Sequence, residues 1–342
     1  MKILIVGEFI HEMYEKALFD AFKERGEKVS LVSLYKYTGN NPLNKFFIKF
    51  QNRLLAGPII CKLNKDLIRQ VRDQKPDLVF LYRTPPIFAE TIIKMKESGC
   101  MVFSYNNDNP FSGIPNLKYW IHYLKAAGFC DHNFVYRKEN VTDFQKIGID
   151  NVSMLRSYYI KGNNYPIECK KTHDVVFIGH FENDGRDKYI KSLIDSGIDV
   201  TVFGDEFWKN APLYEEIKSV IKDSKRGKEY NKTLNKAKIA IVFLSKINND
   251  TYTRRCFEIP ATKTLMLSEY TDDLNNMFEA DKEAVYFISP EELVSKCRYL
   301  LENEKLIDEI AENGYNKLHK SGHEVTDRAK EILKVYSELK LI

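Results

Sequence analysis

Two adjacent arginines and a glutamate stand close together in the sequence DTYTRRCFEIPATKTLMLSEYTDD, residues 250–273. A guanidinium group binds phosphate oxygens through two parallel hydrogen bonds, so Arg254 and Arg255 can hold a diphosphate. The carboxylate of Glu258 cannot contact phosphate favourably, but it can accept hydrogen bonds from the paired hydroxyls of a ribose. The three side chains could therefore bind a nucleoside diphosphate. The alternative is that Arg254 and Glu258 form an exposed i,i+4 ion pair and nothing more.

A helix start is the element expected to position these groups. Thr253 can cap a helix that runs from about Arg254 into Ala261, although Pro260 limits or kinks it. The first turn of a helix offers free backbone amides and the positive end of the dipole. Cations in that turn are disfavoured by about 0.3–1 kcal/mol each, and a bound anion would explain why two arginines stand there.

Short apolar runs alternate with helical patterns along the whole chain. Strands that are apolar throughout are buried on both faces, which is typical of parallel sheets covered by helices. This alternation predicts an α/β fold of two Rossmann-like, doubly wound domains, with ligands at the carboxyl ends of the strands and in the cleft between the domains. The predicted strands are 2–7, 28–34, 77–82, 101–105, 133–136, 151–155, 174–179, 199–204, 238–244, 264–268 and 284–289.

Composition and cysteine usage exclude several classes of protein. The chain has 342 residues, of which 44% are hydrophobic and 29% charged, as in an ordinary soluble globular protein. No apolar run approaches the roughly 18 residues of a membrane span, and MKILIVGEF is too short for a secretory signal, so we expect a cytoplasmic protein. Six scattered cysteines without a CxxC pair predict reduced thiols rather than disulfides or zinc.

The missing motifs and the charge distribution limit the classes of ligand that the protein could bind. Neither predicted domain has GxGxxG after its first strand, and the chain lacks GxxxxGK[ST] and GxSxG, which disfavours simple NAD or ATP chemistry. Residues 1–165 carry 24 Lys and Arg against 16 Asp and Glu, a charge of +8, and the remainder carries 28 against 32, or −4. The basic half suggests an anionic ligand or an acidic partner surface, while no recognisable nucleic-acid module is present.

Several residues at predicted strand ends are further candidates. Gly179 allows the backbone to approach a phosphate or simply makes a turn, and His180 is either a phosphate ligand or a surface histidine. Arg186 lies on the same loop and could be another phosphate ligand. In the first half, Asp108 could orient or deprotonate an acceptor hydroxyl, or it could form an Asx-turn before Pro110.

Two other segments bear on the acceptor. Glu8 and His11 follow the first predicted strand and could line the acceptor side, or form a plain loop. The segment NKFFIKFQNRLL, residues 44–55, places lysines and an arginine beside a stripe of phenylalanines. It could rest peripherally on an anionic membrane surface near a lipid-linked acceptor, or its phenylalanines could belong to the core.

The stretch RCFEIPATKTLMLSEYTDDLNNMFEADKEAVYFISPEELVSKCRYLL, with IAENGYNKL after it, resembles the C-terminal domain of bacterial GT-B glycosyltransferases. It is most similar to the spore-maturation-protein (CgeB-like) group, which is related to the group-1, family-4-type enzymes. The resemblance is specific over about 235–320 and weaker elsewhere. It implies an N-terminal acceptor-binding domain over 1–157, a nucleotide-sugar donor domain over 158–322, and a C-terminal helix over 323–342 that crosses back to the first domain.

The resemblance also implies roles for the residues of the opening motif. Family-4-type enzymes carry an acidic pair spaced E-x7-E, and here Asp250 stands in the first place and Glu258 in the second. Glu258 would then contact the ribose, Asp250 the donor sugar and Arg255 the diphosphate, with Arg254 as a second cation. The implied reaction is metal-independent glycosyl transfer from a nucleoside-diphosphate sugar to a glycan or lipid-linked acceptor, with retention of configuration and no cofactor.

Two other functions stay open at this point. A sugar-nucleotide epimerase of the related two-domain fold would use the same donor cradle, with acid and base groups at the sugar. A non-catalytic module could bind a nucleotide sugar or a glycan without turning it over. The two are separated from a transferase by their products, because an epimerase acts without an acceptor and a binding module yields no product.

Overall fold

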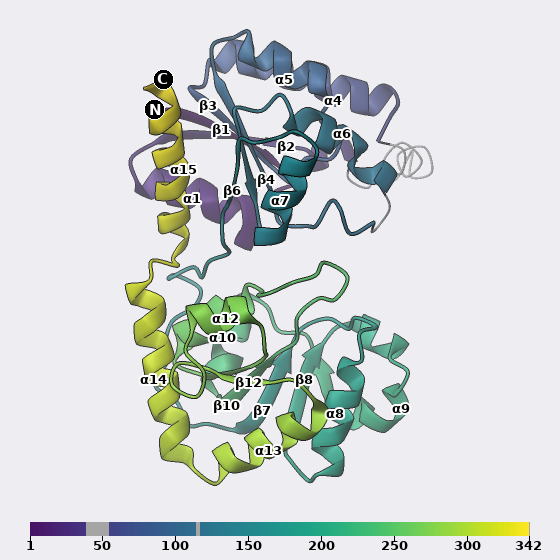
Figure 1. Cartoon of the computed structure of the whole chain (residues 1–342), viewed down its shortest axis with the longest axis vertical. Coiled ribbons are helices and arrows are strands. Elements are labelled where there is room, and N and C mark those ends of the chain that lie inside the picture. The colour runs from purple at the N-terminus through teal and green to yellow at the C-terminus, as the bar shows by residue number, and fades with distance from the viewer. Residues whose placement is uncertain (39–54, 114–116, 342) are drawn as a thin grey trace. The chain divides into compact units, whose positions relative to one another are not determined.

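The computed structural model describes residues 1–38, 55–113 and 117–341 (Figure 1). The chain divides into two compact units, one made of Met1–Arg156 and Val325–Ile342 and the other of Ser157–Glu324. Each unit contains a six-stranded sheet in which every pairing is parallel. The prediction of two Rossmann-like, doubly wound sheets is therefore confirmed.

The first unit orders its strands β2-β1-β3-β4-β5-β6. Its central strands are apolar throughout because helices cover both of their faces; all five residues of LVFLY in β3 are buried. The strands are β1 (Lys2–Gly7), β2 (Lys28–Ser33), β3 (Leu78–Tyr82), β4 (Met101–Asn106), β5 (His132–Val135) and β6 (Val152–Met154). The helices are a π-helical turn η1 (Glu12–Lys16), α1 (Ala17–Glu24), α2 (Tyr35–Thr38), α4 (Pro58–Gln74), α5 (Ala89–Lys96), α6 (Leu117–Ala127), α7 (Lys138–Lys146) and α15 (Val325–Lys340).

The two faces of this sheet are covered by different helices. Leu67 of α4 and Ile92 of α5 pack with Val79 and Val102 in one buried cluster. On the opposite face, the Phe22 ring of α1 lies against a β3 phenylalanine, and the α15 tyrosine ring lies against a β4 phenylalanine. The last helix α15 packs along α1 and so belongs to the first unit, although it follows the second in the chain (Figure 1).

The second unit orders its strands β12-β11-β10-β7-β8-β9. Its strands are β7 (His173–Ile178), β8 (Val200–Gly204), β9 (Ile221–Asp223), β10 (Ala237–Val242), β11 (Leu265–Glu269) and β12 (Val285–Phe287). Its helices are α8 (Arg186–Asp195), η2 (Glu206–Asn210), α9 (Tyr214–Ile217), η3 (Lys218–Val220), α10 (Gly227–Asn235), α11 (Arg255–Glu258), η4 (Pro260–Thr262), α12 (Asp272–Met277), α13 (Pro290–Leu301) and α14 (Glu304–Lys320). One core cluster joins Phe177 and Ile241 to Leu193 of α8 and Leu293 of α13.

Strand order identifies one point in each sheet where a ligand is expected. In the first unit the chain leaves β1 toward β2 on one side and later places β3 on the other side. In the second unit β8 and β10 flank β7 in the same way. Crevices at the carboxyl ends of such strand pairs are where open α/β sheets bind ligands, because the loops there diverge.

The structure corrects two local predictions. The helix expected from Arg254 into Ala261 is only α11, followed by the 3-10 turn η4, since Pro260 cannot continue the hydrogen-bond ladder. Thr253 does not cap it through its side chain, because Arg254 already has helical angles and occupies the N-cap position. The helical segment after β1 is kinked, because Tyr14 has non-helical angles inside η1 and α1 begins only at Ala17.

Three further predictions concern the cysteines, membrane-spanning helices and the segment 44–55. All six cysteines are free thiols, as expected. Within the described part of the chain, none of the helices combines the length and the apolar character that a membrane crossing requires. The segment 44–55, considered as a membrane contact, lies outside the described residues apart from Leu55.

His132 makes the stability of the first unit depend on pH. Burial between two phenylalanine rings lowers the pKa of this histidine from its ordinary value of 6.5 to about 4. The unfolded chain therefore binds a proton between pH 6.5 and 4 that the folded chain does not, so stability falls as pH falls through that window. We expect a loss of about 1–2 kcal/mol after discounting for the half-buried ring. Urea unfolding from pH 7 to 4 checks this, and His132→Asn should lose that part of the pH dependence.

Candidate active site

Arg255 reaches from α11 to the carboxyl end of β7 and lies over Gly179. Its Nε donates a hydrogen bond to the Ile178 carbonyl at 2.6 Å, and its guanidinium lies 5.7 Å from the centre of the Phe177 ring. A methyl group on Gly179 would lie 2.6 Å from Nη2 of this arginine, so only glycine leaves room for it. Among the described residues, the side chain makes this one hydrogen bond, and its two Nη groups remain available for a ligand.

Trp208 also fixes the Gly179 peptide, in addition to the contacts of Arg255. The indole Nε1 of Trp208 donates a hydrogen bond to the Gly179 carbonyl at 2.9 Å. The indole itself lies where a side chain on Gly204 would be, because a Cβ there would come within 2.2 Å of it. Two strand-end glycines and two large side chains therefore form a rigid wall beside the β7 end.

Glu258 and Arg254 are paired, but not as a surface pair. Arg254 Nε lies 3.7 Å from Glu258 Oε1, and the two side chains are only 13% and 12% exposed. The Tyr230 hydroxyl donates a hydrogen bond to Glu258 Oε2 at 2.9 Å, and the Arg254 guanidinium lies 5.3 Å from the centre of the Tyr158 ring. The simple interpretation of an exposed i,i+4 pair is therefore incomplete, since tyrosines hold both partners in a partly enclosed place.

Burial and charge keep the Tyr230 hydroxyl protonated. Burial, followed by the negative charge of Glu258, holds the pKa of Tyr230 well above its ordinary value. The tyrosine therefore stays a hydrogen-bond donor to the carboxylate at any physiological pH. This contact orients Glu258 while leaving carboxylate lone pairs that further donors, such as ribose hydroxyls, can use.

Asp250 closes the loop that follows β10. Its backbone N–H donates to the Ser245 carbonyl at 2.9 Å, directly after Asn249, which adopts a left-handed conformation with φ of 54°. Burial raises the pKa of the Cys256 thiol in α11 to about 12, and the negative charge of the half-buried Asp250 adds to this effect. Asp250 thus lies on the loop after β10, the strand that pairs with β7; its predicted contact with the donor sugar stays a prediction.

Arg186 braces the loop after β7 instead of facing outward. Its guanidinium bonds Asp184 through Nε at 2.9 Å and Nη2 at 2.5 Å, and Nη1 donates to the His180 carbonyl at 2.7 Å. The residue is 3% exposed, so these contacts favour a positioning role over direct contact with phosphate. The His180 ring is half exposed and pairs with Glu182 at 3.0 Å, which places it on the rim of the same loop.

Glu182 stays ionised beneath His180. Burial opposes its charge, but the His180 hydrogen bond and the Arg186 charge outweigh burial and lower the pKa of Glu182. The loop after β7 therefore carries a network of two carboxylates, one arginine and one histidine. A network of this kind holds the loop in one conformation and presents the His180 ring to solvent.

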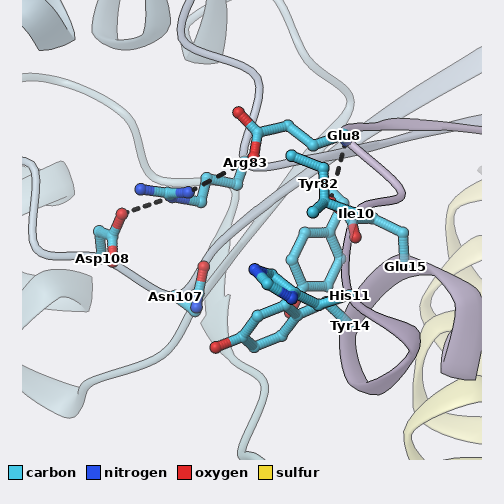
Figure 2. A pocket seen from close by; sticks show the side chains of 9 residues that line it. All are labelled: Glu8, Ile10, His11, Tyr14, Glu15, Tyr82, Arg83, Asn107 and Asp108. Carbon is cyan, nitrogen blue, oxygen red and sulfur yellow. Dashed lines mark hydrogen bonds and ion pairs between the residues drawn. The ribbon is translucent and has the colours of Figure 1, made fainter. Parts of the chain in front are cut away.

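In the first unit, a cavity of about 240 Å³ opens at the carboxyl ends of β1, β3 and β4 (Figure 2). Three residues predicted for the acceptor side, Glu8, His11 and Asp108, all line it. The predicted site residues therefore form two groups, each at the switch point of its own sheet. The other lining residues are Ile10, Tyr14, Glu15, Tyr82, Arg83 and Asn107.

Arg83 is the cation of this cavity and was not predicted. Its Nε bonds Asp108 Oδ2 at 2.5 Å, and its Nη1 lies 4.0 Å from Glu8 Oε2 (Figure 2). Although burial opposes it, the Asp108 charge raises the pKa of Arg83 further above its ordinary value. Asp108 is thus held as an ion pair, which favours an orienting role over proton abstraction.

The turn around Asp108 also differs from the predicted Asx-turn. The Asx-type contacts are made by its neighbours: Asn106 Oδ1 accepts from the Asp108 N–H at 3.1 Å, and Asn109 Oδ1 accepts from the Phe111 N–H at 3.0 Å. The Asp108 side chain is therefore left to face Arg83. Arg83 could have been found from the sequence, because it directly follows the buried strand LVFLY, as Glu8 follows β1.

Comparison with known proteins agrees with this arrangement. Residues 186–334 match the family described as glycosyl transferase-like, and most of that match falls in the second unit. The chain has the two-domain GT-B fold, and its second unit is similar to glycosyl transferases. Among curated protein sequences, no match is found.

Solved structures share the fold of this chain at low sequence identity. HepE from Anabaena, solved with UDP and glucose, has a TM-score of 0.73 and 13% identity, covering 99% of this chain and 100% of HepE. Sucrose-phosphate synthase from Thermosynechococcus elongatus has 0.72 and 9%, covering 100% and 99%. The UDP-GlcNAc 2-epimerase from Neisseria meningitidis, bound to UDP-GlcNAc, has 0.57 and 11%, covering 99% and 100%.

Proposed function

We propose that the enzyme transfers a glycosyl unit from a nucleoside-diphosphate sugar held by the second unit to a hydroxyl of an acceptor held by the first unit. The observation that carries this proposal is the placement of Arg255 over Gly179 with two Nη groups available. A bare glycine backbone beside a guanidinium is suited to a diphosphate, because both can approach the phosphate oxygens closely. HepE, a structural neighbour, was solved with UDP-glucose, which supports a donor of this class.

The donor site must stabilise the negative charge that develops on the leaving diphosphate. As the bond between the sugar and the diphosphate breaks, the leaving diphosphate gains negative charge and the sugar becomes oxocarbenium-like. Arg255 is fixed before the reaction by Ile178 and Phe177, so it stabilises that developing charge without reorganising. The four-residue helix α11 contributes little macrodipole, and the guanidinium therefore supplies most of the stabilisation.

The other members of the donor group have complementary roles in this proposal. Glu258, oriented by Tyr230, accepts hydrogen bonds from the ribose hydroxyls. Asp250 faces the donor sugar, and Arg254 holds Glu258 in place. His180, on the rim of the β7 loop, is a further phosphate ligand, while Arg186 holds that loop. No cofactor takes part, and among the described residues no group of acidic, cysteine or histidine side chains is arranged to hold a metal ion.

The acceptor in this proposal is a glycan or a lipid-linked saccharide of the kind found in bacterial surface glycans. Glu8, His11 and Asp108 in the cavity of the first unit offer hydrogen-bond acceptors suited to sugar hydroxyls. An epimerase is the second candidate, because the Neisseria epimerase shares the two-unit architecture. It predicts a change in the donor sugar when no acceptor is present.

The test begins with thermal-shift measurements against UDP-, GDP-, dTDP- and CMP-sugars. A ligand at about 100 times its Kd stabilises the folded state by about 2.7 kcal/mol, which raises the melting temperature measurably. The sugar nucleotide that binds is then supplied with and without a panel of saccharide acceptors, in the presence of EDTA. Glycosylated product only with acceptor supports the proposal; an altered sugar without acceptor supports the epimerase, and binding with no product contradicts both.

A further inference from the structure

The cavity of the first unit contains a buried carboxylate that the proposed function has not used. Glu15 is 5% exposed, and it lines the cavity from the π-helical turn η1 (Figure 2). Its Oε1 accepts a hydrogen bond from the Glu8 N–H at 3.1 Å. Its side chain occupies the space over Gly7, where an added Cβ would lie 2.5 Å from its Cγ.

The three carboxylates of the cavity differ in their partners. Asp108 is bonded to Arg83 at 2.5 Å, and Glu8, which is 42% exposed, lies 4.0 Å from the same arginine. Among the described residues, no lysine, arginine or histidine lies within 4.0 Å of the Glu15 carboxylate. Asp108 is therefore paired with a cation, whereas Glu15 is buried without one.

The burial of Glu15 affects its titration. Burial, with a smaller contribution from the negative charge of Glu8, raises the pKa of Glu15 above its ordinary value. A carboxylate with a raised pKa is a stronger base and so a better proton acceptor. Glu15 is carried by a turn that is kinked at Tyr14, where the backbone angles are non-helical.

We propose that Glu15 accepts the proton of the acceptor hydroxyl during glycosyl transfer. The inference rests on the proposed function, because it requires an acceptor bound in this cavity. Arg83 and Asp108 would orient that acceptor, and Glu15 would act on its nucleophilic hydroxyl. It assigns the proton acceptor to a residue that no sequence motif indicated.

Proton transfer and bond formation balance in this step. The acceptor O–H bond breaks and its proton passes to a carboxylate oxygen of Glu15, while the acceptor oxygen forms a bond to C1 of the donor sugar. The bond between C1 and the diphosphate oxygen breaks, and the diphosphate leaves with the electron pair. Glu15, now a neutral carboxylic acid, returns the proton to solvent after the product departs. An oxygen of the leaving diphosphate could accept the same proton, so the test must distinguish the two acceptors.

The titratable and charged groups that line the same cavity surround Glu15 from several elements. Glu8, His11 and Tyr14 come from its own segment, and Arg83 and Asp108 come from the ends of β3 and β4, together with the Tyr82 ring. Burial and Glu8 raise the pKa of Glu15, while Arg83 and backbone hydrogen bonds lower it. The net direction is upward, so the acidic limb of the rate profile should lie above the range of an ordinary glutamate.

Glu15→Gln separates a chemical role from a structural one. The glutamine oxygen can still accept the Glu8 N–H, so the loop is preserved, but the amide cannot take a proton. We expect kcat to fall at least about a hundredfold while the thermal shift by the nucleotide sugar is unchanged. The acidic limb of kcat/KM against pH should disappear in this variant. Glu12→Gln, an exposed position on the same turn, is the matched control and should match wild type.

Glu15→Asp guards against a variant that fails to fold. It keeps a carboxylate with a shorter reach, and it should give an intermediate rate with the acidic limb retained. Transfer by Glu15→Gln within about threefold of wild type, with the acidic limb intact, would overturn the inference and favour the diphosphate as proton acceptor. The proposed function would survive that result; it fails separately if the wild-type enzyme transfers no sugar from any nucleotide sugar that it binds.

Discussion

Arg255→Ala is expected to slow glycosyl transfer by about a hundredfold or more. A charged donor that is fixed before the reaction typically contributes about 3–4 kcal/mol to the transition state, because it meets charge that develops only as the leaving group departs. The loss should appear mainly in kcat, since the ground-state diphosphate retains the Gly179 backbone and the other contacts of the loop. Initial rates at saturating donor and acceptor measure it.

Two further variants serve as a conservative substitution and as a control for Arg255→Ala. Arg255→Lys keeps a positive charge but cannot offer two parallel hydrogen bonds, so we expect an intermediate rate. Arg69→Ala removes an exposed arginine of α4 that pairs with Asp66, and it should leave the rate unchanged. Wild-type turnover by Arg255→Ala, in a protein with an unaltered melting temperature, would remove Arg255 from the reaction.

Glu258→Ala is expected to weaken donor binding by about tenfold to a hundredfold. A hydrogen bond to a charged group contributes about 1.5–3 kcal/mol, and the carboxylate would lose at least one such bond to the ribose. The same change leaves the Tyr230 hydroxyl without its acceptor, which should destabilise the second unit by about 1–3 kcal/mol. Donor titration by calorimetry and urea unfolding measure the two effects independently.

Tyr230→Phe is the matched variant for that experiment. It removes the hydroxyl that orients Glu258 and leaves the carboxylate able to bind ribose, so donor affinity should fall less than in Glu258→Ala. Both variants should keep a kcat closer to wild type than Arg255→Ala does. Unchanged donor affinity in a folded Glu258→Ala enzyme would contradict the ribose assignment and leave Glu258 only a structural role with Arg254.

Much of the fold follows from local patterns in the sequence. All five side chains of LVFLY are buried, as expected for a strand that helices cover on both faces. The polar residues that follow such strands mark the edge of the sheet where ligands bind. For this reason Gly179, Glu8 and Asp108 could be named as candidates from strand ends alone. The arginine and glutamate of the TRRCFE stretch could be named as well, because their chemistry is explicit in the residue types.

Contacts between distant segments were decided only by tertiary structure. Arg255 meets the β7 end 77 residues away, because β10 lies beside β7 and the loop after it turns back over that end. Arg83 and Asp108 meet because β3 and β4 are neighbours. Strand order sets which loops adjoin, and periodicity along one segment carries no information about it.

The roles of buried charges likewise depended on the folded structure. Arg186 looked like a phosphate ligand from its place after β7, yet Asp184 and the His180 carbonyl engage its guanidinium. Glu15 was not among the candidate residues, because its burial at the cavity depends on the kinked turn that follows β1. The sequence by itself determined the elements and the chemically capable side chains, because burial patterns and residue types are local. Which charges face a ligand and which hold a loop was decided by packing, because desolvation and pairing depend on neighbours far apart in the chain.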